Sequence, residues 1–418
     1  MGGLVSFMGT TQALAVPQQN VNPASRQKAN AGSKNASESA EFKKLAARAT
    51  GARDQDRMQE AAVLYQKALR LNPRWQEGWW YLGTLDYDAN NYGDGVKAFR
   101  NLVELNRNNV PGLAMLGLCE FETHDYGNAF VHLEMAKLKG IGNTDELGHV
   151  VLYHLALLHI LHGEFETANE QLGELVHQNV LTADVKMAEG LTLLRVPILP
   201  DQIDPEKDAL ISDAGKIEEL IALLDFDEAD KLFQQLVHDY PATPFVHYAY
   251  AFMLSGLSEY ERAEEELHEE LKINSESPLP YLLLAFVDVR LGRIQDALSQ
   301  TQEAVKLAPQ NYAAHYLMGR ALLDTGKAGE AVDELLTAKR LAPDSPQVRY
   351  TLAMALSRAK RSREAAAEQA EFQRLNALAQ SRRSGGASDV KTPSRNSSAP
   401  GEITPDQLQS PPARDPHQ

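Results

Sequence analysis

The sequence predicts an all-α protein, an α-solenoid of about nine helix-turn-helix units with disordered termini. A small side chain returns every 34 residues in two series along the chain, and proline recurs where a unit would close. Such a period is typical of stacked helix pairs, which expose one long surface and enclose no central pocket. The small residues of the two series are Ala61, Gly95 and Ala129, then Ala229, Ala263, Ala297, Ala331 and Ala365, with Ala168 between them.

Composition limits the classes of partner. The 418 residues are 43% apolar, which is enough for a core, and carry a formal net charge of −16. That charge argues against nucleic acid as a partner, because binding phosphates requires a basic surface. It also disfavours an anionic membrane surface, and no apolar run is long enough to span a bilayer. The single cysteine, Cys119, excludes an internal disulfide.

Both ends of the chain differ in composition from the middle. Residues 1–15 are uncharged and end in Ala13-Leu14-Ala15, which resembles the second half of a secretory signal peptide without its basic start. If this is a truncated signal, we expect a periplasmic or secreted protein, and otherwise a cytoplasmic one. Residues 16–40 and 381–418 are rich in small and polar residues, so we predict a disordered linker and a disordered tail.

Between these ends the helical pattern falls into two blocks. Four units occupy residues 41–182 and five units occupy 210–380, the last of which caps the array. Residues 183–209 form a non-repeat joint, with a helix expected from Val185 to Leu194 and prolines Pro197 and Pro200 ending it. The units begin at Phe42, Gln76, Val110, His149, Leu210, Pro244, Pro278, Tyr312 and Pro346.

The eighth position of a unit is small in every case except one. Helices that cross closely need Ala or Gly at the contact, because a larger side chain would force them apart. Proline after the second helix ends it and starts the next helix well. The eighth positions are Ala49, Gly83, Gly117, Ala156, Ile217, Ala251, Ala285, Gly319 and Ala353, so only Ile217 departs.

This pattern resembles the tetratricopeptide repeat, with small residues at the eighth and twentieth positions of each unit. The unit from 76 to 109 is the best example, with Trp79, Leu82 and Gly83, then Tyr92 and Phe99. The family's closing proline is present at Pro73, Pro241, Pro309 and Pro343. The resemblance covers about residues 42–380 and implies a right-handed superhelix that binds other proteins.

The resemblance also implies which side chains line the concave groove, because positions 2, 5, 9, 12 and 13 of each unit tend to face inward. Aromatic side chains recur at the fifth and ninth positions and suit a peptide or helix that inserts apolar anchors. The same rings are also expected if they pack between neighbouring first helices as ordinary core. The candidate partner-binding residues are Trp80, Tyr153, Tyr248, Phe252, Phe286, Tyr316 and Tyr350.

No motif points to catalysis, a cofactor or a metal. The sequence lacks a phosphate-binding loop, a nucleophile elbow, an HExxH motif and a dinucleotide fingerprint. We therefore predict a non-enzymatic scaffold that binds a peptide or helix of another protein in the groove. Two alternatives stay open. One is a structural component of an envelope or secretion assembly, with self-association possible, and the other is an enzyme with its site in the joint or in the histidine-rich third and fourth units.

Overall fold

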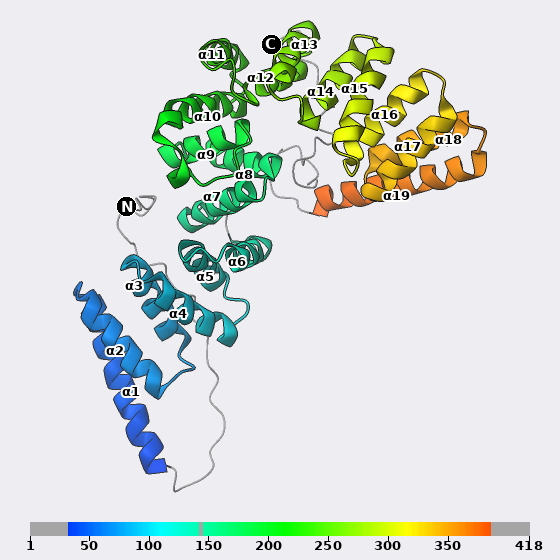
Figure 1. Ribbon diagram of the computed structural model, residues 1–418. Coiled ribbons are helices and arrows are strands. Elements are labelled where there is room, and N and C mark those ends of the chain that lie inside the picture. The colour runs from blue at the N-terminus through cyan, green and yellow to red at the C-terminus, as the bar shows by residue number, and fades with distance from the viewer. Residues whose placement is uncertain (1–31, 142–144, 386–418) are drawn as a thin grey trace. The chain divides into compact units, whose positions relative to one another are not determined.

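The computed structural model describes residues 32–141 and 145–385, and within these ranges the chain is helical with no strand. The signal peptide predicted at 1–15 and most of the linker and tail, 16–31 and 386–418, lie outside the described residues. In the described part, no helix combines the length and the apolar character needed to cross a bilayer. The predicted all-α, repeat-built fold is confirmed (Figure 1).

The chain divides into two compact units, which we describe separately. The first contains residues up to His159 together with Glu170–Val185, and the second contains Ile160–Asn169 and the chain from Lys186 onward. The helices up to the joint are α1 (Gly32–Arg53), α2 (Met58–Leu71), α3 (Gln76–Asp88), α4 (Tyr92–Leu105), α5 (Val110–Glu122), α6 (Tyr126–Leu138), α7 (Glu146–Leu161) and α8 (Phe165–His177).

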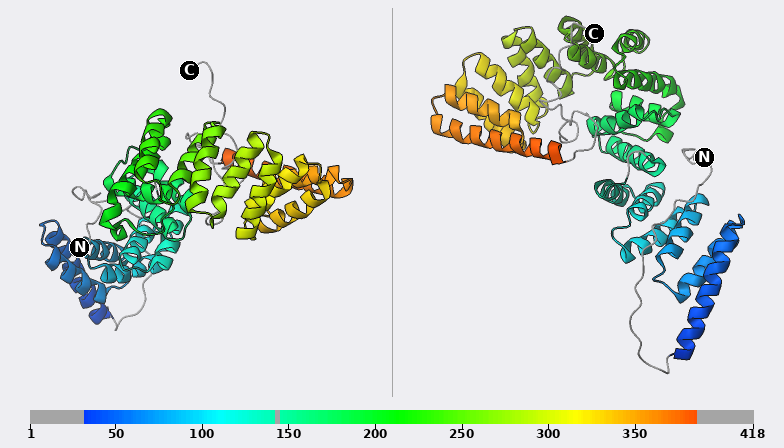
Figure 2. Two further views of the ribbon diagram at one scale, coloured as in Figure 1. Left: turned by 45° about the horizontal axis from the view of Figure 1, so that its top comes forward. Right: turned by 180° about the vertical axis from the view of Figure 1, so that it is seen from behind.

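Helix α9 (Ala183–Leu193) and two short 3-10 turns, Pro200–Gln202 and Pro205–Lys207, occupy the joint. Five helix pairs follow in the second compact unit, and Figure 2 shows from two further directions that its last helices lie side by side in chain order. These helices are α10 (Asp208–Ala222), α11 (Phe226–Asp239), α12 (Val246–Gly256), α13 (Tyr260–Ile273), α14 (Pro278–Arg290), α15 (Ile294–Leu307), α16 (Tyr312–Asp324), α17 (Ala328–Leu341), α18 (Pro346–Arg358) and α19 (Ser362–Gly385).

The helix array extends beyond both predicted boundaries. Helix α1 begins at Gly32, inside the range 16–40 that we predicted to be a linker, and α19 runs to Gly385, past the predicted end at 380. No proline interrupts either extension, and a helix that is already formed propagates at little cost through polar residues. A segment that is poor in aliphatic residues has few side chains to bury, but this composition does not by itself exclude a helix.

Small residues lie where the two helices of a unit cross, as the sequence predicted. In α16, a Cβ added at Gly319 would lie 2.6 Å from Leu335 Cγ and 3.3 Å from the Ala331 carbonyl oxygen of α17. Ala263 and Ala297, which occupy the position of Ala331 in the two preceding units, are fully buried. A larger side chain at these positions would separate the paired helices.

Ile217 departs from the small-residue pattern, and the close contact that α10 makes at a small residue is with α9. The small residue of α10 is Gly215, whose added Cβ would lie 2.8 Å from the carbonyl carbon of Lys186 in α9. Reciprocally, a Cβ at Gly190 of α9 would lie 2.8 Å from the carbonyl carbon of Ile211 in α10. The helix in the joint therefore packs backbone to backbone on the first helix of the next block.

A hydrogen bond to the closing proline joins successive units wherever that proline is present. The fourth residue of the following unit donates to the proline carbonyl in each case, and no such bond is described where the proline is replaced. The four bonds run from Trp79 Nε1 to Pro73 (2.8 Å), from His247 Nε2 to Pro241 (3.2 Å), from His315 Nε2 to Pro309 (3.0 Å) and from Arg349 Nη2 to Pro343 (2.7 Å).

In the last three of these units the same donor also contacts a glutamate of the paired second helix. His247 Nδ1 lies 2.6 Å from Glu266, His315 Nδ1 lies 2.6 Å from Glu334, and Arg349 Nη1 lies 2.8 Å from Glu368. A histidine whose two ring nitrogens both face acceptors satisfies both only as the imidazolium, since neutral imidazole has one N–H. We call each such set, the fourth-position side chain with its proline carbonyl and its glutamate, a proline clamp.

Candidate functional site

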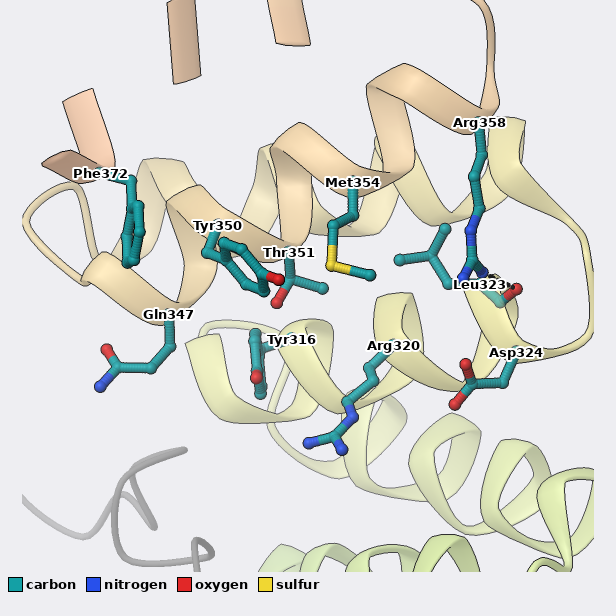
Figure 3. Close-up of a pocket in the computed structure, with 10 residues that line it drawn as sticks. All are labelled: Tyr316, Arg320, Leu323, Asp324, Gln347, Tyr350, Thr351, Met354, Arg358 and Phe372. Atoms are coloured by element: carbon teal, nitrogen blue, oxygen red, sulfur yellow. Dashed lines mark hydrogen bonds between the residues drawn. The ribbon is translucent and has the colours of Figure 1, made fainter. Parts of the chain in front are cut away.

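The candidate site is a cavity of about 440 Å³ in the second compact unit, formed by α16, α18 and α19 (Figure 3). The helices α16 and α18, which are the first helices of their units, each follow a polar residue that caps them. The Asn311 side chain accepts from the Ala314 N–H at 3.1 Å, and Ser345 Oγ accepts from the Val348 N–H at 3.4 Å. The lining residues are Tyr316, Arg320, Leu323, Asp324, Gln347, Tyr350, Thr351, Met354, Arg358 and Phe372.

Most of these lining residues occupy the positions that the tetratricopeptide resemblance assigned to the groove. The α16 unit contributes its positions 5, 9, 12 and 13, and the α18 unit its positions 2, 5, 9 and 13. Thr351 and Phe372 are the exceptions. The cavity is therefore the place where inward-facing positions of two consecutive units meet and leave space between them.

The apolar part of the cavity remains accessible to solvent. Tyr350 is 45% exposed and Met354, one turn later on α18, is 36% exposed, whereas Tyr316 is buried. The Phe372 ring of α19 lies 5.2 Å from the Tyr350 ring, measured between centroids. Large side chains left uncovered beside empty space are what a partner's apolar side chain could cover.

Helix α19, which supplies Phe372, is held in place by charge. Glu368, one turn before Phe372, binds Lys339 of α17 at 2.6 Å and Arg349 of α18 at 2.8 Å. Burial opposes the charge of Glu368, but the two cations outweigh it and hold the pKa of this carboxyl below its ordinary value. The aromatic side of the cavity therefore lies on a fixed element.

Charged side chains lie at the opposite side of the cavity. Arg358 Nη1 donates to the carbonyl oxygen of Leu323 at 2.8 Å and so ties α18 to the end of α16. Arg320 and Asp324, one turn apart on α16, form no ion pair with each other in the described structure, and Figure 3 shows their charged ends separated. Two guanidinium groups against one carboxylate give the lining a net positive charge in a protein of net charge −16.

The seven predicted partner-binding residues do not all lie at the cavity. The structure brings Tyr316 and Tyr350 together in the cavity. Among the other five, Phe252 is partly buried and four are buried within their own compact unit: Trp80 and Tyr153 in the first, Tyr248 and Phe286 in the second.

The buried rings pack against neighbouring rings. Trp80 lies 5.8 Å from Phe99, Tyr153 lies 5.5 Å from His154, and Tyr248 lies 6.3 Å from Phe252. Burial raises the pKa of Tyr248 strongly, as expected for a phenol removed from water. Of the seven residues, Tyr316 and Tyr350 are the two that line the cavity, and only Tyr350 is exposed.

Sequence reasoning passed over Met354, Phe372 and Leu323 as site residues. The first and last of these occupy inward positions 9 and 12, so the position rule alone would have found them. Phe372 lies on a second helix and had no such signal. In the described residues, no group of three or more His, Cys, Asp or Glu side chains is arranged to hold a metal ion.

Comparison with known families adds to this geometry. Residues 288–355, which include α16 and nearly all of α18, match the tetratricopeptide repeat family. This part of the chain therefore belongs to the tetratricopeptide repeat family. Proteins of this family are typically non-enzymatic interaction scaffolds. A search of curated proteins found no significant match.

Solved structures with similar repeats include MamA residues 41 to the end from Desulfovibrio magneticus RS-1 (18% identity, 42% of this chain and 96% of that chain, TM-score 0.37). Yeast Tom70 is 14% identical over 80% of this chain and 85% of its own, with a TM-score of 0.35. YrrB, described as a tetratricopeptide-repeat protein with an unusual peptide-binding site, is 19% identical over 41% of this chain and 88% of its own, with a TM-score of 0.35. Similarity at this level carries no information about the partner of this chain.

Proposed function

We propose that this tetratricopeptide-repeat protein is a binding scaffold that takes up a peptide segment of another protein in the cavity of α16, α18 and α19. The observation that carries the proposal is the exposed pair Tyr350 and Met354, which faces a cavity of about 440 Å³ with Phe372 beside it. Cavities of this size accommodate one or two apolar side chains. Because α18 and α19 are already fixed by the Glu368 ion pairs, binding orders little of the scaffold.

Peptide display against the full chain tests the proposal. We expect selected peptides to share one or two large apolar residues, because those residues would fill the cavity. The dissociation constant of one selected, fluorescein-labelled peptide would then be measured by anisotropy. Replacing Tyr350 or Met354 by Ala removes apolar contact worth about 1–2 kcal/mol, so the dissociation constant should rise about 5- to 30-fold.

Leu336→Ala is the matched control. Leu336 is 38% exposed on α17, close to the exposure of Met354, but it does not line the cavity. Its replacement should leave the dissociation constant unchanged. Far-UV circular dichroism verifies that each variant is folded. If Tyr350→Ala and Met354→Ala proteins bind every selected peptide as tightly as the wild type, the cavity is not the binding site.

A further inference from the structure

The lining of the cavity is complementary to an occupant that is both apolar and acidic. Its floor is made by aromatic and aliphatic side chains, and its charged side carries Arg320 and Arg358 against Asp324 alone. No ion pair joins Arg320 to any carboxylate in the described structure, and the Arg358 guanidinium is bound to a neutral carbonyl. A carboxylate entering beside an apolar anchor would therefore find an unmatched guanidinium group.

The chain itself carries such a segment after α19. Residues 402–408 read Glu-Ile-Thr-Pro-Asp-Gln-Leu, so two large aliphatic side chains, Ile403 and Leu408, are interleaved with two carboxylates, Glu402 and Asp406. Between Gly386 and Gln418 the only other large apolar residue is Val390. The segment therefore offers apolar side chains for the exposed apolar side chains of the cavity and carboxylates for its guanidinium groups.

The length of the chain after α19 decides which of these aliphatic residues can reach the cavity. Phe372 precedes the last helical residue, Gly385, by 13 positions, which corresponds to about 20 Å along the helix. Val390 follows Gly385 by five residues and spans at most about 17 Å, so it cannot return to Phe372. Ile403 follows by 18 residues and spans up to about 60 Å, which is ample.

We propose that residues 402–408 of the same chain occupy the α16–α18–α19 cavity and compete there with the partner peptide. Ile403 and Leu408 cover Tyr350 and Met354, and a carboxylate of the segment pairs with Arg320. A tethered segment of this kind has an effective concentration in the millimolar range, so even a weak fit keeps the cavity occupied until a stronger ligand displaces the segment. The inference rests on the proposed function, since it assigns an internal competitor to that same cavity.

Disulfide trapping in the full chain tests the intramolecular contact. Gln347→Cys places a thiol at the cavity without removing an apolar lining residue, and Leu408→Cys places one in the segment. The native Cys119 stays in place because it is fully buried, and burial raises the pKa of its thiol to about 12. Mild oxidation at low protein concentration is followed by non-reducing electrophoresis and by the mass loss of two hydrogens.

Two matched pairs control for random collision. Gln300→Cys with Leu408→Cys moves the first thiol to another partly buried glutamine, on α15 and outside the cavity. Gln347→Cys with Ala413→Cys moves the second thiol five residues further along the chain. We expect the intramolecular disulfide of the test pair to form at least about tenfold faster than that of either control pair. Equal rates overturn the proposal, and a covalent dimer as the main product assigns the cavity to a second copy and also overturns it.

Peptide affinity separates this inference from the proposed function. In the chain carrying Ile403→Asp and Leu408→Asp, loss of the competitor should lower the apparent dissociation constant of the selected peptide at least about threefold. An unchanged constant together with equal trapping rates rejects the internal competitor. If Tyr350→Ala still weakens the peptide in that case, the binding cavity stands and only its internal occupant is removed.

Discussion

Replacing Gly215 by Ala places one methyl group where α9 and α10 approach most closely. The added Cβ would lie 2.8 Å from the Lys186 carbonyl carbon, 0.6 Å short of ordinary contact at 3.4 Å, and closer still to the carbonyl oxygen. The obstructing atoms belong to a helix backbone, so no side-chain rotation relieves the clash. The two helices must separate, and the reciprocal contact of Gly190 with Ile211 is lost with them.

Two opposing terms set the size of the effect. Overpacking of this kind costs about 1–3 kcal/mol, and a backbone obstacle places it at the upper end. Alanine regains about 1 kcal/mol over glycine through helix propensity. We therefore expect Gly215→Ala to reduce the free energy of unfolding by about 2 kcal/mol, which corresponds to a urea midpoint about 0.7–1 M lower for a slope of about 2–3 kcal/mol/M.

Urea unfolding followed by two signals measures this prediction and localises it. The three tryptophans, Trp75, Trp79 and Trp80, lie in the first compact unit, so their fluorescence reports on that unit, whereas far-UV circular dichroism reports on all helices. The circular dichroism midpoint should fall while the fluorescence midpoint stays. Gly173→Ala is the control, because its Cβ meets nothing within 4 Å, and it should be neutral or stabilising. A Gly215→Ala protein as stable as the wild type would refute the reasoning.

Three further predictions concern titratable groups. Burial opposes the charge of His247 but Glu266 outweighs it, and Glu334 is the main cause at His315, so the pKa of both histidines is raised above 6.5. The stabilisation by these two imidazolium groups is complete below pH 6.5 and is lost as the pH rises through the raised pKa values. Urea titration should therefore show that the wild type loses stability as the pH rises above 6.5, whereas a His247→Gln/His315→Gln protein should not. Glu270 is fully buried and accepts hydrogen bonds from the Phe245 N–H at 2.8 Å and the Tyr248 N–H at 3.2 Å. Glu270→Ala should therefore lower the free energy of unfolding, measured by heat or urea, by about 1–3 kcal/mol. Replacement of the exposed Glu269 by Ala is the control and should change it very little. Cys119, whose pKa burial raises to about 12, should react with a chromogenic disulfide at pH 8 only at the rate of unfolding, and rapid reaction of the folded protein would contradict its burial.

The repeat pattern carried most of the fold and part of the site. Small residues at helix crossings follow from close packing, so their period revealed the units and their boundaries to within a few residues. The inward positions 2, 5, 9, 12 and 13 also matched the cavity lining. Sequence periodicity could not show how deeply a fifth-position ring is covered, because that depends on the neighbouring units: Tyr248 is 4% exposed and Tyr350 is 45% exposed at equivalent positions.

The repeat pattern did not predict contacts between a repeat unit and the joint, or hydrogen bonds between one unit and the next. The approach of α9 to α10 was not anticipated, because Gly190 and Gly215 lie outside the 34-residue series. The proline clamps were also missed, although their signal is present in the sequence: each closing proline is followed six residues later by a side chain with an N–H donor. A search for one repeating position does not detect pairs of positions, such as the closing proline and its donor, that are present together in some units and absent together in others.

The proline clamps restrict how the units could be rearranged. A unit that follows a closing proline brings its own donor, whereas the unit beginning at Pro278 follows Ser275 and has Tyr281 at the fourth position. Exchanging that unit with the one beginning at Pro244 would leave the Pro241 carbonyl facing the Tyr281 phenol ring and would place Ser275, in place of Pro309, before His315. Modules of this array are thus not interchangeable parts, and any duplication or shuffling during its history had to carry the donor and the preceding proline together.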